Sequence, residues 1–223
     1  EKKYSGSYQS GPLSFEYFVE NKKIITNCGF GNKISSKAEL ISRLTSAQST
    51  LCINDSSVVK FEKNSLIQNT FGTTITDSFK VFDINNNEDS HFVYTSGTHD
   101  AYKNNFSYLH KRSIKISKKN ADLFGKDELI SLDNNKQVNN IYAIRFHLYP
   151  GVSAVQTMGK NSILVHTEKN KSLIFTTSGE NLALEKSIFL GRNQIINNFC
   201  ITISGALSNN ENKTINWELK KYN

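Results

Sequence analysis

The stretch that decides the fold is Tyr142-Ala-Ile-Arg-Phe-His-Leu-Tyr-Pro-Gly-Val152, because two kinds of side chain alternate along it. Side chains of a β-strand point to opposite faces with a period of two. One face would carry the bulky apolar residues Tyr142, Ile144, Phe146 and Leu148. The other would carry Ala143, Arg145, His147 and Tyr149. Pro150 lacks the N–H that a sheet needs, so the strand ends there. The stretch predicts a half-buried strand whose second face offers a cation, an imidazole and a phenol.

The rest of the chain repeats this pattern in short runs, separated by turns rich in Asn, Gly, Ser and Lys. We expect strands at Leu13–Val19, Ile24–Asn27, Ser49–Asn54, Val58–Phe61, Phe79–Asp83, His91–Ser96, Phe106–Ser117, Asp127–Leu132, Val152–Thr157, Ser162–Thr167, Ser172–Thr176, Leu182–Leu190, Gln194–Ser204 and Thr214–Lys220. The first two should form a hairpin. About fourteen strands and at most one short helix predict an all-β fold, a large antiparallel β-sandwich of stacked sheets.

The single helix is expected at Ser36–Leu44, with Ser36 as its N-cap and Glu39 completing a capping box. Residues 64–77 should form an irregular excursion, and Ile84–Asp89 a polar loop. No linker rich in Pro, Gly or Ser divides the 223 residues, so a single domain, 1–223, is predicted.

Charge and hydropathy narrow the classes of partner. A net charge of +7 permits a polyanionic partner. There is no basic helix, zinc-finger spacing or RNA-binding aromatic signature, so nucleic acid is not expected. No apolar run approaches the roughly 20 residues that cross a bilayer, so no membrane span is expected either. The chain lacks a starting Met and a signal peptide, which suggests a mature product or a fragment.

Three cysteines, Cys28, Cys52 and Cys200, lie in or beside apolar runs, and none belongs to a CxxC motif. They are expected to be buried free thiols. One disulfide with a single cysteine left over is the alternative.

Several short motifs occur in a particular order: Leu13-Ser-Phe-Glu16, Ile25-Thr-Asn-Cys-Gly29, Thr45-Ser-Ala-Gln-Ser-Thr-Leu51, Thr98-His-Asp-Ala-Tyr102, Leu109-His-Lys-Arg112, Tyr142–Val152, Leu184-Glu-Lys-Ser-Ile-Phe-Leu-Gly191 and Ile215-Asn-Trp-Glu-Leu-Lys220. In this order they resemble the carboxy-terminal β-sandwich of the heparinase II/III-like polysaccharide lyases over nearly the whole chain. In complete enzymes of that family the sandwich follows an amino-terminal α/α-toroid that carries most catalytic residues. The resemblance also implies a bacterial periplasmic or secreted location.

The resemblance includes a local test for a metal. Many members place two histidines and an acid where this chain has Gln9, Asn27 and Gln48. Those side chains bind a metal or shape the active-site floor. Three neutral amides lack the charge and basicity that Zn²⁺ requires, so no metal and no other cofactor is expected. The amides would instead hydrogen-bond internally or to a sugar hydroxyl, which makes them candidate substrate-binding residues.

The remaining candidates come from two stretches. Arg145 can pair with a uronate or sulfate through its planar guanidinium, and Tyr149 is a further candidate for substrate binding. The alternative for Arg145 is an ion pair with a carboxylate on the sandwich surface. The candidate catalytic residues are His99, Tyr102 and His147. Asp100 could orient His99, and a tyrosine can serve as general acid. The alternative for residues 99–102 is a hydrogen-bonded turn.

Two further residues are ambiguous in the sequence. His110 could be a core histidine or part of a basic stripe with Lys111 and Arg112. Trp217, the only tryptophan, is expected to pack in the core, with sugar stacking as the alternative.

Lyase chemistry on uronates needs a base for the C5 proton, neutralisation of the carboxylate and an acid for the leaving oxygen. The resemblance therefore predicts the sandwich part of a lyase that cleaves anionic polysaccharides by β-elimination. The sandwich would brace the missing toroid and form one wall of the substrate cleft. By itself the chain is expected to be catalytically incomplete. The alternative is a glycan-binding or scaffolding sandwich without catalysis.

Overall fold

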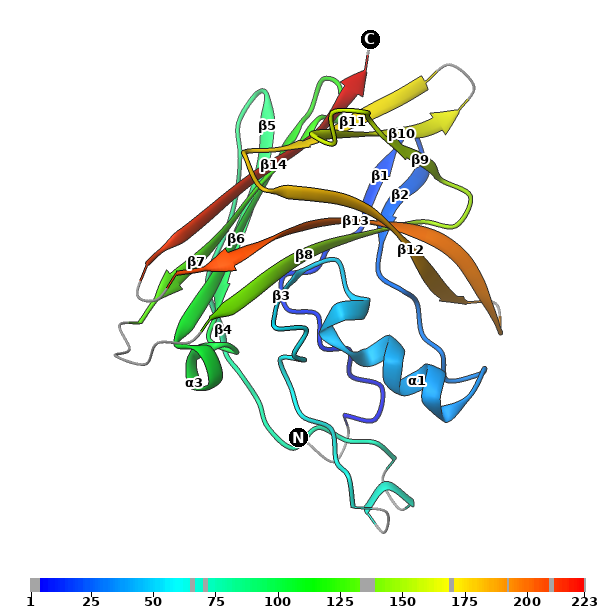
Figure 1. Ribbon diagram of the computed structural model, residues 1–223, viewed down its shortest axis with the longest axis vertical. Coiled ribbons are helices and arrows are strands. Elements are labelled where there is room, and N and C mark those ends of the chain that lie inside the picture. The colour runs from blue at the N-terminus through cyan, green and yellow to red at the C-terminus, as the bar shows by residue number, and fades with distance from the viewer. Residues whose placement is uncertain are drawn as a thin grey trace.

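The computed structural model describes residues 5–64, 67–69, 72–132, 139–168, 171–191, 193–208 and 211–222. Two antiparallel sheets face each other, and α1 (Ser36–Arg43) lies next to the smaller one (Figure 1). The six-stranded sheet has the order β1 (Tyr17–Val19), β2 (Lys22–Thr26), β8 (Asn140–Leu148), β13 (Gln194–Leu207) and β12 (Asn181–Gly191), with β3 (Leu51–Ile53) also paired to β8.

The eight-stranded sheet has the order β4 (Val81–Glu88), β5 (Phe92–His99), β6 (Tyr108–Ser117), β7 (Leu123–Ser131), β14 (Lys213–Tyr222), β11 (Lys171–Thr177), β10 (Ser162–Glu168) and β9 (Ser153–Gln156). The predicted all-β sandwich is confirmed. The predicted amino-terminal hairpin is present as β1 and β2, which pair in antiparallel register.

Two local strand predictions are wrong. The segment Ile84–Asp89 was expected to be a loop, but β4 runs through it to Glu88 and pairs with β5 along the sheet edge. This strand is almost entirely exposed, so it has no apolar period to detect. Val58–Phe61 was expected to be a strand, but only an isolated bridge joins Phe61 to Ile75. Residues 65, 66, 70 and 71 of the predicted excursion lie outside the described residues.

The predicted helix is present as α1, but its cap lies one residue earlier than expected. The Ser35 side chain accepts a hydrogen bond from Ala38 N at 3.1 Å. With Ser35 as N-cap the third helical residue is Ala38, so the predicted capping box between Ser36 and Glu39 does not form. Two single turns were not predicted, the 3₁₀ turn η2 (Thr45–Ala47) and α3 (Lys103–Phe106), since both are too short to show a helical period. None of the described helices is long and apolar enough to cross a membrane.

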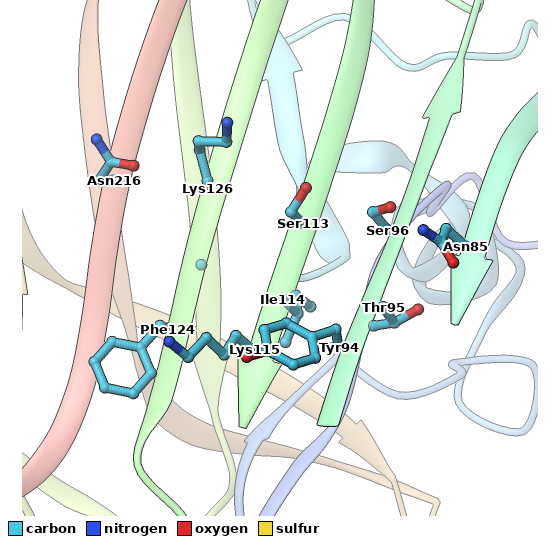
Figure 2. A pocket seen from close by; sticks show the side chains of 11 residues that line it. Asn85, Tyr94, Thr95, Ser96, Ser113, Ile114, Lys115, Phe124, Lys126 and Asn216 are labelled. Atoms are coloured by element: carbon cyan, nitrogen blue, oxygen red, sulfur yellow. The ribbon is translucent and has the colours of Figure 1, made fainter. Parts of the chain in front are cut away.

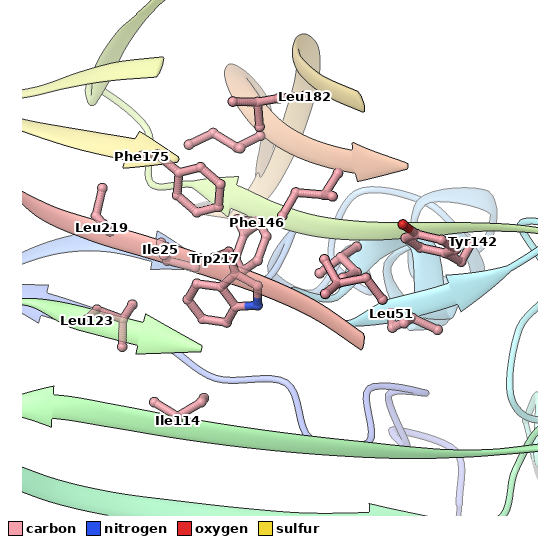
Figure 3. Close-up of a cluster of buried hydrophobic side chains, with 14 of the residues drawn as sticks. Ile25, Leu51, Ile114, Leu123, Tyr142, Phe146, Phe175, Leu182, Trp217 and Leu219 are labelled. Atoms are coloured by element: carbon pink, nitrogen blue, oxygen red, sulfur yellow. The ribbon is translucent and has the colours of Figure 1, made fainter. Parts of the chain in front are cut away.

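The core lies between the sheets and is centred on Phe146 of β8 and Trp217 of β14 (Figure 3). Their ring centroids are 4.6 Å apart, and Phe175 of β11 lies 5.0 Å from Phe146. The predicted inward face of β8 is confirmed, because all four of its apolar side chains are buried: Tyr142, Ile144, Phe146 and Leu148. Burying one such side chain contributes about 1.5–3 kcal/mol, so this strand anchors the smaller sheet.

Candidate functional site

The outward face of β8 is covered at its end by η2 and the residues that follow it. His147 of β8 lies below this cover and is buried. Its Nε2 is 3.0 Å from the Ser46 carbonyl oxygen, so Nε2 must carry the hydrogen. With this assignment Nδ1 accepts hydrogen bonds from the Cys28 thiol at 3.3 Å and the Ser187 hydroxyl at 3.2 Å.

Burial lowers the pKa of His147 from 6.5 to about 4, which outweighs the hydrogen bond to Ser46. The imidazole is therefore neutral at pH 7. It joins four segments of the smaller sheet's outer side, and its ring nitrogens are both engaged by the protein.

Arg145 lies two residues earlier on the same face and reaches the surface. Its Nη2 is 2.7 Å from Asp55 Oδ1, with the Arg145 side chain 17% exposed and the Asp55 side chain 65% exposed. The alternative from the sequence, a surface ion pair with a carboxylate, is thus what the structure contains. Nη1 of Arg145 is buried and has no hydrogen-bond partner among the described residues.

Tyr149 follows the end of β8 and lines a surface hollow of about 480 Å³. Lys23 Nζ lies 5.7 Å from the Tyr149 ring centroid and 5.2 Å from that of Phe18. Phe189 of β12 packs edge-on against Tyr149 at 5.7 Å. The hollow therefore combines aromatic rings with an ammonium group at the end of β8.

The three amides at the family's metal-type positions all bond to the protein itself. Gln9 Nε2 donates to Gly29 O at 3.3 Å, and Gln48 Nε2 donates to Ser42 O at 2.8 Å. Asn27 Oδ1 accepts from Ser49 N at 2.8 Å. Such neutral, already engaged groups do not fit a divalent cation. Across the described residues, no group of three or more His, Cys, Asp or Glu side chains could hold a metal ion. That the protein works without a metal stays a prediction.

His99 lies away from this face, in the interior between the sheets, and takes part in a buried chain of hydrogen bonds. Its Nδ1 accepts from Ala101 N at 3.3 Å, so its Nε2 donates to His110 Nδ1 at 2.9 Å. His110 Nε2 then donates to Asp127 Oδ1 at 2.7 Å. Burial holds the pKa of His99 well below its usual value, so both rings are neutral. His110 is thus a core residue and not part of an exposed basic stripe.

Tyr102 is also buried, and its hydroxyl donates to Leu51 O at 2.7 Å. Asp100 does not orient His99, because its side chain accepts a hydrogen bond from Lys80 N instead. Residues 99–103 form a hydrogen-bonded turn, with Lys103 N bonded to Asp100 O at 2.9 Å. A catalytic role for His99 and Tyr102 stays a prediction, and the structure does not bring them together with Arg145 and Tyr149.

Asp127 and Arg43 are buried charged residues that the sequence did not single out, and Arg112, which the sequence offered only as part of a basic stripe, is buried as well. Arg112 Nε lies 2.8 Å from Asp127 Oδ1, and Trp217 Nε1 donates to Asp127 Oδ2 at 2.8 Å. The available signal was the period of two that puts His110 and Arg112 on the inward face of β6. Trp217 packs in the core as predicted.

The three cysteines are free and buried, as predicted. Burial raises the pKa of each thiol, Cys28, Cys52 and Cys200, to about 12. They are therefore protonated and poor nucleophiles at neutral pH.

Comparison with known proteins defines the class to which this sandwich belongs. Residues 1–218 match the family described as "Heparinase II/III-like, C-terminal". The chain belongs to this family. A comparison with curated protein sequences finds no match.

Solved structures share the fold at low sequence identity. A heparan sulfate lyase, HepC from Pedobacter heparinus, is similar over 96% of this chain and 31% of its own, with a TM-score of 0.73 and 15% identity. A structure of heparinase III has a TM-score of 0.71 and 15% identity, over 96% of this chain and 30% of its own. The Slr1438 protein from Synechocystis has a TM-score of 0.51 and 9% identity, over 96% of this chain and 89% of its own. The chain thus spans about 31% of the length of the heparan sulfate lyase that it matches.

Proposed function

We propose that this chain serves as the carboxy-terminal β-sandwich of a polysaccharide lyase. The lyase would cleave uronic-acid-containing anionic glycans by β-elimination, in a periplasmic or secreted setting. Family membership over residues 1–218 supports a lyase domain. In this proposal an amino-terminal α/α-toroid docks on the sandwich, and the Arg145 face forms one wall of the cleft between them.

The observation that carries the proposal is the geometry of Arg145. Its guanidinium is held near the surface by Asp55 through Nη2, while its Nη1 is buried. A guanidinium binds carboxylate or sulfate through paired N–H donors. When the C5 proton leaves a uronate, negative charge develops toward the carboxylate, and a fixed cation there stabilises the transition state. Asp55 is mostly exposed, so an incoming anion can compete with it.

In this proposal the hollow beside Tyr149 offers a second contact for the glycan at the end of β8. Lys23 lies at its rim, and Phe18 and Tyr149 give it apolar surface. Sugar rings present both hydroxyls and apolar C–H faces, so a mixed lining of this kind suits them. The amides of Gln9, Asn27 and Gln48 support the floor by their hydrogen bonds to neighbouring segments.

The chain supplies only part of the chemistry in this proposal. His147 is the candidate catalytic residue closest in sequence to Arg145, and its imidazole is neutral at pH 7. Both its ring nitrogens are occupied by protein contacts, so in this proposal His147 holds the wall in position and does not take the C5 proton. The base and acid are therefore proposed to come from the toroid.

A glycan-binding sandwich without catalysis is the second candidate. One observation favours it: the Slr1438 protein has this fold over 89% of its own chain, so the fold occurs in proteins of about this size.

A polysaccharide panel tests the proposal. Heparin, heparan sulfate, chondroitin sulfate and alginate are titrated into the 223-residue chain by calorimetry, with and without zinc. In parallel, the ultraviolet absorbance of newly formed unsaturated uronate is followed. Binding without absorbance growth is the expected result. Absorbance growth that disappears in an Arg145→Ala, His147→Ala double variant would show that the sandwich alone is a lyase. Absence of binding to every member would contradict the cleft-wall role.

A further inference from the structure

A second polar surface lies on the outer face of the eight-stranded sheet. Five side chains stand next to one another across five adjacent strands, and we call them the polar row: Asn216, Lys126, Ser113, Ser96 and Asn85. Each is the direct cross-strand partner of the next, from β14 through β7, β6 and β5 to β4. Neighbouring strands lie about 4.8 Å apart, so the row crosses about 19 Å of the sheet.

The polar row faces away from the core. Its members alternate with the inward residues Ile114, Asp127 and Trp217, which are buried between the sheets. Arg145 belongs to the outward side of the other sheet. The polar row and the Arg145 face therefore lie on opposite sides of the sandwich.

Most of the polar row is not engaged by the protein. Within the part of the chain that the structure describes, the side chains of Asn85, Ser96, Ser113 and Asn216 have no hydrogen-bond partner. Asn216 bonds to Thr177 and Ser178 only through its main chain. Lys126 is the exception, since its Nζ lies 3.1 Å from Glu128 Oε1. Donors and acceptors are thus available at regular spacing along the sheet.

A second row runs parallel to the first and is largely aromatic. We call Phe124, Lys115 and Tyr94 the aromatic row, because Phe124 is the partner of Lys115 and Lys115 is the partner of Tyr94. Lys115 Nζ lies 5.4 Å from the ring centroid of Phe124 and 5.8 Å from that of Tyr94. Residues of both rows line a hollow of about 370 Å³. Figure 2 shows their side chains.

The chemistry of this hollow selects a class of ligand. The hydroxyls and amides of the polar row match the hydroxyls of a sugar, and the aromatic row offers apolar surface to a C–H face. Among the residues that line the hollow, only Lys115 and Lys126 carry charge, and both are positive.

We propose that the groove between the polar row and the aromatic row binds a short anionic oligosaccharide bearing uronate or sulfate groups. The choice of glycan rests on the proposed function, whereas the position of the groove does not. A second binding surface behind the cleft wall would hold a long polymer on the protein between encounters with the cleft, by raising its effective concentration.

Chemical-shift mapping on the ¹⁵N-labelled chain tests the proposal, with a size-defined heparan sulfate oligosaccharide as the probe. The expected result is that the amide signals of Ser96, Ser113 and Lys126 shift on titration. In a Lys126→Ala, Asn216→Ala double variant the affinity for the oligosaccharide should fall by about tenfold, since the variant removes a charged contact and an amide contact. Lys118→Ala, which removes an exposed ion-paired lysine just after the end of β6, is the matched control and should leave binding unchanged.

The outcomes separate this inference from the proposed function. Shifts confined to residues around Arg145 would overturn the second site and leave the cleft wall standing. Shifts at the polar row that persist in Arg145→Ala would support the second site whether or not the cleft wall exists. A neutral oligosaccharide of equal length that binds the row as tightly would overturn the anionic class, and so would tighter binding of single-stranded DNA.

Discussion

Arg112 and Asp127 form a two-point ion pair in the interior of the sandwich. Nε lies 2.8 Å from Oδ1 and Nη2 lies 3.2 Å from Oδ2, with the side chains 2% and 0% exposed. Burial by itself raises the pKa of a carboxyl group, but Arg112 and His110 outweigh it and hold the pKa of Asp127 well below its usual range. The charged carboxylate thereby joins β6, β7 and β14.

Replacing this carboxylate should be costly. Asp127→Asn leaves the Arg112 charge buried and unpaired, and we expect the free energy of unfolding to fall by about 3–5 kcal/mol. Urea unfolding followed by circular dichroism measures the loss. Asp55→Asn, at the exposed ion pair with Arg145, is the matched control and should cost about 1 kcal/mol or less. Equal small losses in both variants would contradict a structural role for the buried pair.

The buried histidines predict a pH dependence of stability. His147 has a folded-state pKa of about 4 against 6.5 in the unfolded chain, so the unfolded state binds the proton first. The contribution of His147 to the free energy of unfolding should therefore fall by about 3 kcal/mol as the pH drops from 6.5 to 4, and change little below that. The pKa of His99 is lowered in the same direction and adds to the loss.

The variant His147→Gln isolates this contribution, because glutamine keeps a donor for Ser46 O but does not titrate. Unfolding free energies at several pH values between 4 and 7 are the measurement. In the variant, the free energy of unfolding should fall less steeply with decreasing pH than in the parent chain. An unchanged slope would mean that His147 is accessible to protons in the folded state.

Gly125 allows the Trp217 ring to lie directly against β7. A Cβ at this position would come within 2.0 Å of Trp217 Cζ2, so Gly125→Ala must displace the indole from Asp127 and Phe146. We expect destabilisation by about 1–3 kcal/mol, seen as a lower midpoint of thermal unfolding. Gly159→Ala is the control, because its nearest atom would be 3.4 Å away, and it should be close to neutral. A neutral Gly125→Ala would contradict the packing of Trp217.

The thiols should be silent in the folded protein. With the pKa of each cysteine raised to about 12 by burial, a disulfide-exchange reagent at pH 8 should label none of them quickly. Denaturant should expose all 3. A titre of one thiol under non-reducing denaturation would reveal a disulfide, and fast labelling of the native protein would contradict the burial.

The features that were predicted best from the sequence are those that depend on the local alternation of apolar and polar residues. Alternation along Tyr142–Leu148 is strong, so the inward face of β8 and the sandwich class followed from it. The edge strand β4 carries polar side chains on both faces, so its period is hidden. The network of His99, His110 and Asp127 depends on the register between strands far apart in the chain, which no local pattern contains.

The candidate site shows the same limit. The surface position of Arg145 follows from the alternation, but the cover that η2 places over His147 does not. The capping-box pattern favoured Ser36 over the adjacent Ser35, but the helix begins one residue earlier and Ser35 is the N-cap. The polar row depends on five strands being in register, so it too was invisible before the fold.

The central claim, that the Arg145 face contacts an anionic glycan, is tested most directly by one titration. The affinity of the 223-residue chain for a heparan sulfate oligosaccharide is measured by calorimetry. All chains carry Lys126→Ala and Asn216→Ala, which remove the second groove. The parent in this background is compared with Arg145→Ala and with the surface control Lys118→Ala. Arg145→Ala should bind about tenfold more weakly than the parent, while Lys118→Ala should bind equally well. Equal binding by Arg145→Ala and the parent would contradict the claim.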